Sequence, residues 1–166
     1  NFNVSIGGYG LARVRAEQFD NGSYDYCGDE LTLEVRRKYT RDAETCEELE
    51  TPTYSEWGPY IDLSCCDAGS NVLVELRVTD VNGNSNMCWL EILVEDKVQP
   101  YCTGLEDQFV KCDELPEGFD AFDPAVLSEL FGMPEVIDNC SAEAIEMTPE
   151  VNLDECGGGT IIRKFT

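Results

Sequence analysis

Cysteine is the residue type with the most evident chemistry in this sequence of 166 residues. Disulfides are typical of oxidising compartments, so this many thiols favours an extracellular or cell-surface protein. No histidine and no Cys-x-x-Cys pair is present, so the spacing of a structural zinc site is missing. An odd number leaves at least one sulfur free or bonded to another chain. The nine cysteines are Cys27, Cys46, Cys65, Cys66, Cys88, Cys102, Cys112, Cys140 and Cys156.

Catalytic chemistry has little support in the residue types. Without histidine, triads of the Ser/His or Cys/His kind are excluded. The 34 acidic residues are spread along the chain, so no carboxylate pair is singled out for acid–base work. The stretch "CGGGT" at 156–160 lacks the lysine of a phosphate-binding loop. We therefore expect no enzyme, and no cofactor other than calcium.

Calcium is the metal to consider, because Asp and Asn side chains gathered in turns supply the oxygen ligands that it prefers. None of the clusters reproduces an EF-hand loop, and we favour a hairpin turn as the role of Asn82-Gly83. If no calcium is bound, excess chelator leaves the melting temperature of the chain unchanged. The candidate ligands are Asp20, Asn21 and Asp25, then Asp80, Asn82 and Asn84, and finally Glu95 and Asp96.

Two further kinds of side chain have possible roles at the surface. Asn3, Asn21 and Asn139 each begin an Asn-x-Ser triplet, the spacing of a glycan acceptor. The aromatic residues of "YSEWGPY" at 54–60 fit either a small satellite core or a ligand-binding loop, and we favour the satellite core.

The charge balance restricts the partners. A net charge of -23 repels nucleic acid and anionic membrane surfaces, so no nucleic-acid partner is expected. No stretch approaches the ~20 apolar residues of a membrane-spanning helix, so we expect no membrane insertion.

Hydrophobic residues alternate along several short segments, which is the period of half-buried β-strands. Turn residues separate these segments, and the combination predicts an all-β protein built as β-sandwiches. One helix is predicted at 123–131, where Asp123 can cap, Pro124 suits the first position and Gly132 can terminate. The expected strands lie within 12–16, 31–35, 72–78 and 87–96.

The chain divides near "VEDKVQPYC", where a strand ends in charged residues and a proline follows. We predict a module at 1–97, with a long insertion at 36–61, and a second module at 98–166, with the helix as its insertion. The second module corresponds to two-thirds of a domain, because it lacks a counterpart to "VLVELRVTDVNGNSNMCWLEILVED" apart from the first strand of that stretch. Its last segment, "IIRKFT" at 161–166, alternates like a strand and has no partner strand after it.

Three stretches in order carry a family resemblance: "DNGSYDYC", the long "CCDAGSNVLVELRVTDVNGNSNMCWLEILVEDKVQPYC", and "IDNCSAEAI…LDECGGGTIIRKFT". They resemble the tandem hyalin-repeat-like (HYR-like) immunoglobulin-type modules of large bacterial surface and secreted proteins. Both expected modules are covered. The resemblance implies two disulfide-stapled Ig-like β-sandwich modules, the second incomplete within this chain.

The resemblance also implies cysteine pairings. Cys27 would bond Cys65, and Cys140 would bond Cys156. Cys46 and Cys66 are additions to the family pattern, and their bond would pin the insertion. The family partners of Cys88 and Cys102 would lie outside this chain, which makes Cys88, Cys102 and Cys112 candidates for bonds to other polypeptide.

Two interpretations of the incomplete module stay open. The chain is a window of a longer tandem array, or it is a subunit whose neighbours supply the missing strands by β-strand addition, which would propagate a filament. "NFNVSI" at 1–6 is either a donor strand or, as we prefer, the first strand of its own sandwich. The expected function is a structural repeat of a surface filament or adhesin. The alternative is a carbohydrate- or protein-binding adhesion module that uses the 36–61 insertion as its contact loop.

Overall fold

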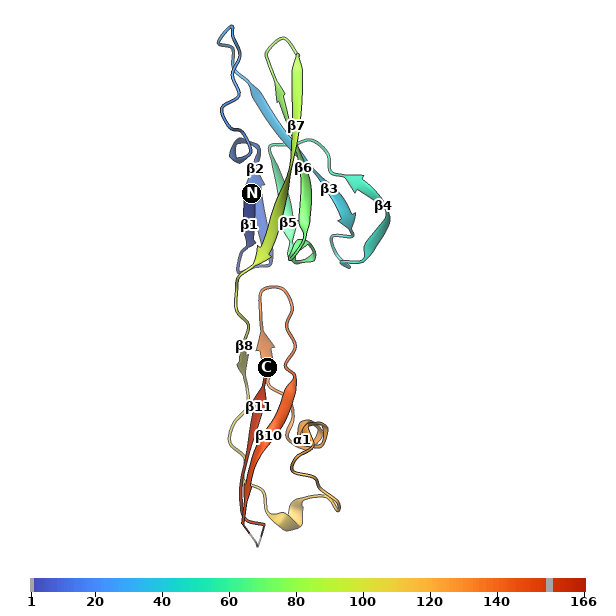
Figure 1. The fold of residues 1–166 in the computed structure, drawn as a ribbon, viewed down its shortest axis with the longest axis vertical. Coiled ribbons are helices and arrows are strands. Elements are labelled where there is room, and N and C mark those ends of the chain that lie inside the picture. The colour runs from blue at the N-terminus through green and yellow to red at the C-terminus, as the bar shows by residue number, and fades with distance from the viewer. Residues whose placement is uncertain (1, 155–156) are drawn as a thin grey trace. The chain divides into compact units, whose positions relative to one another are not determined.

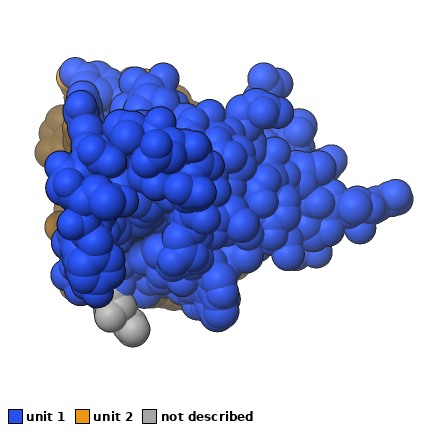
Figure 2. Space-filling model, turned by 90° about the horizontal axis from the view of Figure 1, so that it is seen from above, with its two compact units in different colours: residues 1–98 blue, residues 99–166 orange. Residues whose placement is uncertain are grey.

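The computed structural model describes residues 2–154 and 157–166, and it is mostly β. The chain forms two compact units, unit 1 at Asn1–Val98 and unit 2 at Gln99–Thr166, which are coloured separately in Figure 2. In the described part of the chain, no helix combines the length and the apolar character needed to span a membrane.

Unit 1 contains a five-stranded sheet and a two-stranded sheet (Figure 1). The large sheet has the order β1-β7-β6-β3-β4, in which β1 is parallel to β7 and the other pairs are antiparallel. The N-terminal strand therefore lies in the sheet of its own unit. The strands are β1 (Phe2–Ile6), β3 (Thr32–Arg41), β4 (Glu48–Tyr54), β6 (Asn71–Thr79) and β7 (Ser85–Asp96), with β2 (Leu11–Arg15) and β5 (Tyr60–Ser64) in the small sheet.

Alternation along the strands builds the core of unit 1. On β6, Val72, Val74 and Leu76 are buried, while the residues between them are partly exposed. The small sheet contributes buried residues from both of its strands, so apolar side chains of the two sheets form one core. The other core residues are Ile6, Val14, Ala16, Val35, Ile61, Leu63, Cys66, Ile92 and Val94.

The β6–β7 hairpin closes through the turn that contains Asn82 and Gly83. Gly83 has a φ of 85°, a conformation that side-chain-bearing residues rarely adopt. The Asp80 carboxylate accepts hydrogen bonds from the backbone N–H groups of Asn82 (2.9 Å) and Asn84 (2.8 Å). This turn fixes the register between β6 and β7.

The segment 36–61 contains more strand than loop. Its first residues continue β3 as far as Arg41, β4 follows antiparallel to β3, and Tyr60 begins β5. Short 3-10 helices follow β2 (η1, Ala16–Gln18) and β5 (η2, Cys65–Asp67).

The described residues of unit 2 form two separate pairs of strands, an α-helix and a short 3-10 helix. β8 (Tyr101–Thr103) pairs with β9 (Glu135–Ile137), and β10 (Glu146–Leu153) pairs with β11 (Gly159–Phe165), both antiparallel. η3 spans Cys112–Glu114. The helix α1 (Pro124–Phe131) matches the sequence prediction.

The helix ends agree with their expected capping. The Asp123 side chain accepts a bond from Ala125 N (2.9 Å), and Pro124 occupies the first turn. Gly132 follows the last helical residue with a φ of 75°. Leu127 is the buried residue that anchors the helix in unit 2.

Candidate interaction sites

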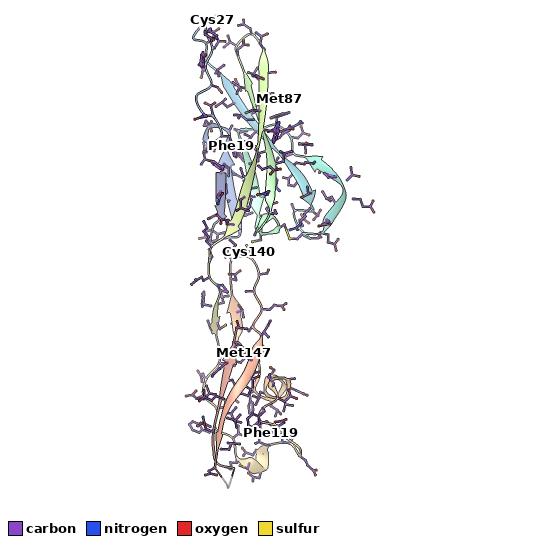
Figure 3. All side chains as sticks on the ribbon, viewed as in Figure 1. Phe19, Cys27, Met87, Phe119, Cys140 and Met147 are labelled. Carbon is purple, nitrogen blue, oxygen red and sulfur yellow. A yellow bond between two sulfur atoms is a disulfide. The ribbon has the colours of Figure 1, made fainter. Side chains whose placement is uncertain are left out.

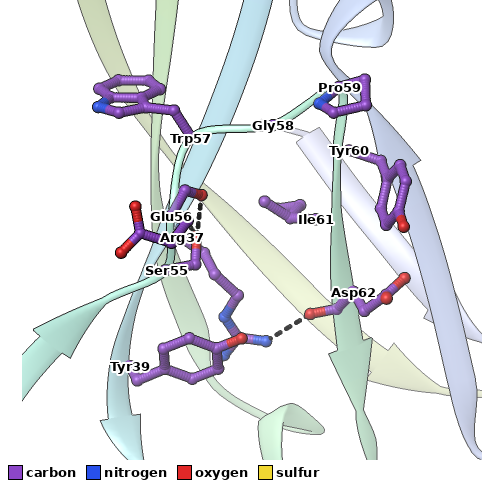
Figure 4. Close-up of a pocket in the computed structure, with 10 residues that line it drawn as sticks. All are labelled: Arg37, Tyr39, Ser55, Glu56, Trp57, Gly58, Pro59, Tyr60, Ile61 and Asp62. Carbon is purple, nitrogen blue, oxygen red and sulfur yellow. Dashed lines mark hydrogen bonds between the residues drawn. The ribbon is translucent and has the colours of Figure 1, made fainter.

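A pocket of about 410 Å³ opens on unit 1 where the 36–61 segment meets β5 (Figure 4). Its wall is built by the end of β3, the turn between β4 and β5, and β5 itself. Gly58 bridges back to Val35 by two backbone hydrogen bonds of 2.7 and 3.0 Å, which holds the turn against β3. The lining residues are Arg37, Tyr39, Ser55, Glu56, Trp57, Gly58, Pro59, Tyr60, Ile61 and Asp62.

Arg37, one of the lining residues, belongs to a buried ion pair with Asp67. Arg37 is 4% exposed and Asp67 is 7% exposed. The Arg37 guanidinium donates to both oxygens of Asp67, one of them at 2.7 Å, and to the backbone carbonyl of Asp62 at 2.8 Å. Asp67 also accepts a bond from Ser64 N at 2.9 Å. The charge of Arg37 is therefore neutralised within the unit, and this residue is a structural element rather than an anchor for an anionic ligand.

Aromatic rings near the pocket stack against arginines rather than against each other. The guanidinium groups of Arg36 and Arg77 lie 4.6 and 4.4 Å from the centre of the Trp57 ring, and Arg13 lies 3.7 Å from that of Tyr60. Tyr54 and Tyr60 are 41% and 42% exposed, so the expected satellite core does not form. The rings gain cation–π contacts instead of mutual burial.

Ion pairs across β3 and β6 hold these arginines in place. Arg36 pairs with Glu75, and Arg77 pairs with Glu34, each at 2.6 Å. On β5, a hydrogen bond from Arg13 lowers the pKa of the Asp62 carboxyl below its ordinary value. The pocket thus presents an indole and hydroxyl groups, which are suited to binding a polar ligand, whereas both oxygens of the Asp62 carboxylate already accept hydrogen bonds from Arg13.

The structure decides two of the three expected disulfides. The Cys46–Cys66 bond is formed, and it ties the β3–β4 connection to η2. The expected Cys27–Cys65 bond is wrong, because Cys27 is free and exposed whereas Cys65 is disulfide-bonded. Cys140 is also disulfide-bonded, and its expected partner Cys156 lies outside the described residues.

The register of β2 explains why Cys27 cannot reach Cys65. Leu11, which begins β2, is opposite Ser64, so Cys65 lies at that end of the small sheet. Arg15, at the other end of β2, leads into the loop that carries Cys27 to the far end of unit 1 (Figure 3). Cys65 therefore lies near the first residue of β2, whereas Cys27 follows the last residue of β2, at the opposite end of that strand. In the described chain the free cysteines are Cys27, Cys88, Cys102 and Cys112, all exposed.

The expected calcium ligands are used in local hydrogen bonds. Asp20 accepts bonds from the N–H and hydroxyl of Ser23, which lower the pKa of its carboxyl. Bonds from Asn84 lower the pKa of Asp80 in the same way. Bonds from Lys97 and Asn3 lower that of Glu95.

The candidate metal ligands belong to three separate regions of unit 1. Asp20, Asn21 and Asp25 lie in the β2–β3 connection, Asp80, Asn82 and Asn84 in the β6–β7 turn, and Glu95 and Asp96 at the end of β7. Within the described residues, no three His, Cys, Asp or Glu side chains come together in a way that could hold a metal ion. Calcium binding stays a prediction.

The glycan candidates differ in exposure. Asn3 and Asn21 are exposed, whereas Asn139 is half-buried. The Asn3 amide donates a hydrogen bond to Glu95 at 3.1 Å. Glycan attachment at the three positions stays a prediction, and exposure favours Asn3 and Asn21.

The β10–β11 hairpin of unit 2 is a second candidate site, because the described residues form a sheet of only these two strands. One face packs on the helix: Glu146 pairs with Arg163 at 2.7 Å and accepts a bond from Ser128 of α1. The other face exposes apolar side chains, among them Met147 at 50% and Ile162 at 48%. An open edge of this kind is a template for pairing with another strand.

Unit 2 buries little apolar surface around this hairpin. Of its described residues only Ala121, Leu127 and Pro149 are buried, and Phe109 is 99% exposed. Three buried residues are few for a compact unit of this size, which is normally stabilised by a contiguous core.

Comparison with known proteins gives no relative for this chain: no protein-family model, no curated protein and no solved structure matches it.

Proposed function

We propose that this chain is an extracellular structural unit of a bacterial surface filament or adhesin, made of Ig-like modules of the HYR-like type. Its role is mechanical: disulfide-stapled β modules act as rigid units, and neighbouring polypeptide completes their open sheets. The neighbours are copies of the chain or adjacent repeats of one polypeptide. The observation that carries the proposal is the open β10–β11 sheet in a unit with three buried residues among those described.

The cysteines support the same role. Cys46–Cys66 fastens unit 1 internally, while Cys27, Cys88, Cys102 and Cys112 are free and exposed. Exposed thiols in an oxidising compartment form disulfides when a second thiol reaches them. These four residues are therefore the candidates for covalent links between modules.

Mass analysis of the chain under oxidising conditions tests this function. We expect a ladder of covalent multimers that collapses to one mass on reduction, and uniform fibres in electron micrographs. In the matched control variant, serine replaces the four exposed cysteines and the Cys46–Cys66 bond stays intact. We expect this variant to form no ladder and to keep unit 1 folded. A chain that stays a single monomeric species before and after reduction, and forms no fibres, would contradict the proposal.

The pocket favours one second function, the binding of a glycan or a protein by the 36–61 segment. Trp57, whose ring contacts the guanidinium groups of Arg36 and Arg77, lines this pocket together with Tyr39 and Tyr60, and aromatic side chains with polar tips suit a polar ligand with apolar faces. Quenching of tryptophan fluorescence on titration with a glycan panel would support it. Such binding by a monodisperse monomer would favour this function over the structural one.

A further inference from the structure

The five-stranded sheet of unit 1 shows how a strand such as β11 can pair on both of its edges. There, β6 lies between β3 on one side and β7 on the other. Val35 on β3 bonds to Gly58, so its backbone amide points away from β6. Because amide directions alternate along a strand, Arg36 bonds to β6, opposite Glu75. Glu75 therefore directs its own amide toward β3.

The residues of β6 next to Glu75 face β7 for the same reason. Val74 and Leu76 are buried in the core, and the amides on this edge of β6 bond to alternate residues of β7. Val94 N donates to Ser70 O at 3.1 Å, which confirms that the even-numbered residues of β7 face β6. The pairs are Val74 with Leu90, Leu76 with Cys88, and Val78 with Asn86.

In unit 2, β10 and β11 repeat the pairing of β3 and β6. When Thr166 is aligned with Thr79, the pair Met147 and Lys164 corresponds to the pair Glu34 and Arg77, and both pairings are antiparallel. β10 contains a bulge near Pro149 that β3 lacks at this point, yet β11 itself runs without interruption. In this alignment β11 corresponds to β6.

The free edge of β11 follows from one pair of backbone hydrogen bonds at its end. Thr166 N donates to Ile145 O at 3.0 Å, and Ile145 N donates to Thr166 O at 2.9 Å, so the Thr166 backbone faces β10. By alternation, the amides of Phe165, Arg163 and Ile161 face the opposite edge. These residues correspond to Val78, Leu76 and Val74, the residues of β6 that bond to β7.

The side chains beside this edge set the chemistry of the strand that fits it. Ile161 and Phe165 are half-buried apolar residues on the face toward the helix. Arg163 lies between them, but its charge is satisfied by Glu146 and by the carbonyl of Gly132 at 2.6 Å. An incoming strand therefore needs uncharged residues on this face, with an apolar residue opposite Ile161 and no acidic residue opposite Arg163.

We propose that the free edge of β11 accepts an antiparallel strand of the β7 kind from another module of the same type. The occupant places residues equivalent to Leu90, Cys88 and Asn86 opposite Ile161, Arg163 and Phe165. The residues equivalent to Leu90 and Cys88 extend the apolar face, and the backbone of the occupant completes the ladder. This inference rests on the proposed function, because it names the partner of the open sheet.

A synthetic peptide with the sequence of β7, Ser85–Asp96, and with Cys88→Ser to prevent disulfide formation, tests the site on the full chain. Hydrogen exchange is measured residue by residue in dilute, reduced solution. We expect exchange at the amides of Ile161, Arg163 and Phe165 to slow by about tenfold or more in excess peptide. The amides of Ile162 and Lys164, which already face β10, serve as internal controls and should change little.

Two modified peptides act as a matched pair. N-methylation at the positions of Asn86, Cys88 and Leu90 removes the donors that face β11, and we expect binding to be lost. N-methylation at Met87, Trp89 and Glu91 removes the donors on the edge of the peptide that faces away from β11, so we expect binding to persist. Equal binding of both peptides, protection confined to unit 1, or no protection at any peptide concentration would each overturn the inference.

The outcomes separate this inference from the proposed function. Multimers and fibres without peptide protection on β11 would leave the structural role standing and refute the strand site. Peptide protection in a chain that never forms multimers or fibres would establish the site and refute assembly of the chain by this route.

Discussion

Arg37, which lines the unit 1 pocket, forms a buried ion pair with Asp67. Arg37 stands at an inward-facing position of β3, two residues after Val35, where the alternation would otherwise place an apolar side chain. Removing one partner from such a pair leaves an uncompensated charge in the interior, which costs far more than the net contribution of the intact pair.

We predict that Asp67→Asn lowers the free energy of unfolding of unit 1 by about 3–5 kcal/mol, because Arg37 then stays buried without a counter-charge. Urea unfolding followed by tryptophan fluorescence measures this, since Trp57 and Trp89 both lie in unit 1. The control is Lys97→Gln, which removes the exposed Lys97–Glu95 pair and should cost about 0–1 kcal/mol. Equal losses in the two variants would show that Asp67 is not needed to neutralise Arg37.

Individual residues show what the sequence could and could not predict. The Cys46–Cys66 bond is confirmed, whereas the predicted Cys27–Cys65 bond is wrong. A similar sequence pattern does not show that these two cysteines lie near opposite ends of β2. The Arg37–Asp67 pair was not predicted. Its signal was an arginine at an alternating apolar position, which requires a buried acid from elsewhere in the chain.

At the scale of elements, local patterns were sufficient where neighbours in sequence pair. The β6–β7 hairpin and the helix α1 follow from alternation, from Asn82-Gly83 and from the caps at Asp123 and Gly132. The parallel pairing of β1 with β7 joins Phe2 to Ile92, and no local pattern encodes a contact at that separation. The strand β4 was also missed, because its residues are mostly exposed and do not alternate.

Acid should loosen the contact between the helix and the β10–β11 hairpin. The hydrogen bond from Arg163 lowers the pKa of Glu146, whose side chain is 3% exposed, below its ordinary value. A carboxyl with a lowered pKa in the folded state stabilises that state at pH values above its unfolded pKa of about 4.3. The stabilisation is lost as the pH falls from there through the lowered value.

We therefore predict that the stability of unit 2 is constant near neutral pH and falls below about pH 4. Urea titrations followed by NMR signals of Ile161 and Phe165 report on this hairpin. Glu146→Gln should be less stable at pH 7 and should show a smaller loss in acid than the parent chain. Parallel pH profiles for the two proteins would mean that another group is responsible for the acid sensitivity.

At the scale of the whole molecule, charge opposes the assembly that the open sheet favours. Every copy has a formal charge of -23, so approaching copies repel one another over the range of the unscreened field. The Debye length shortens from about 30 Å at 0.01 M salt to about 8 Å at 0.15 M. Strand addition and apolar burial act at contact distance, so screening weakens the repulsion much more than the attraction.

We predict that non-covalent association of the chain increases with ionic strength when the exposed thiols are kept reduced. Light scattering between about 0.01 M and 0.15 M sodium chloride should show the average mass rising. The double variant Glu106→Gln with Asp107→Asn removes two charges from an exposed segment and should associate at lower salt than the parent. Association that instead weakens with salt would mean that attraction between unlike charges holds the copies together, and strand pairing at β11 would then not be the main contact.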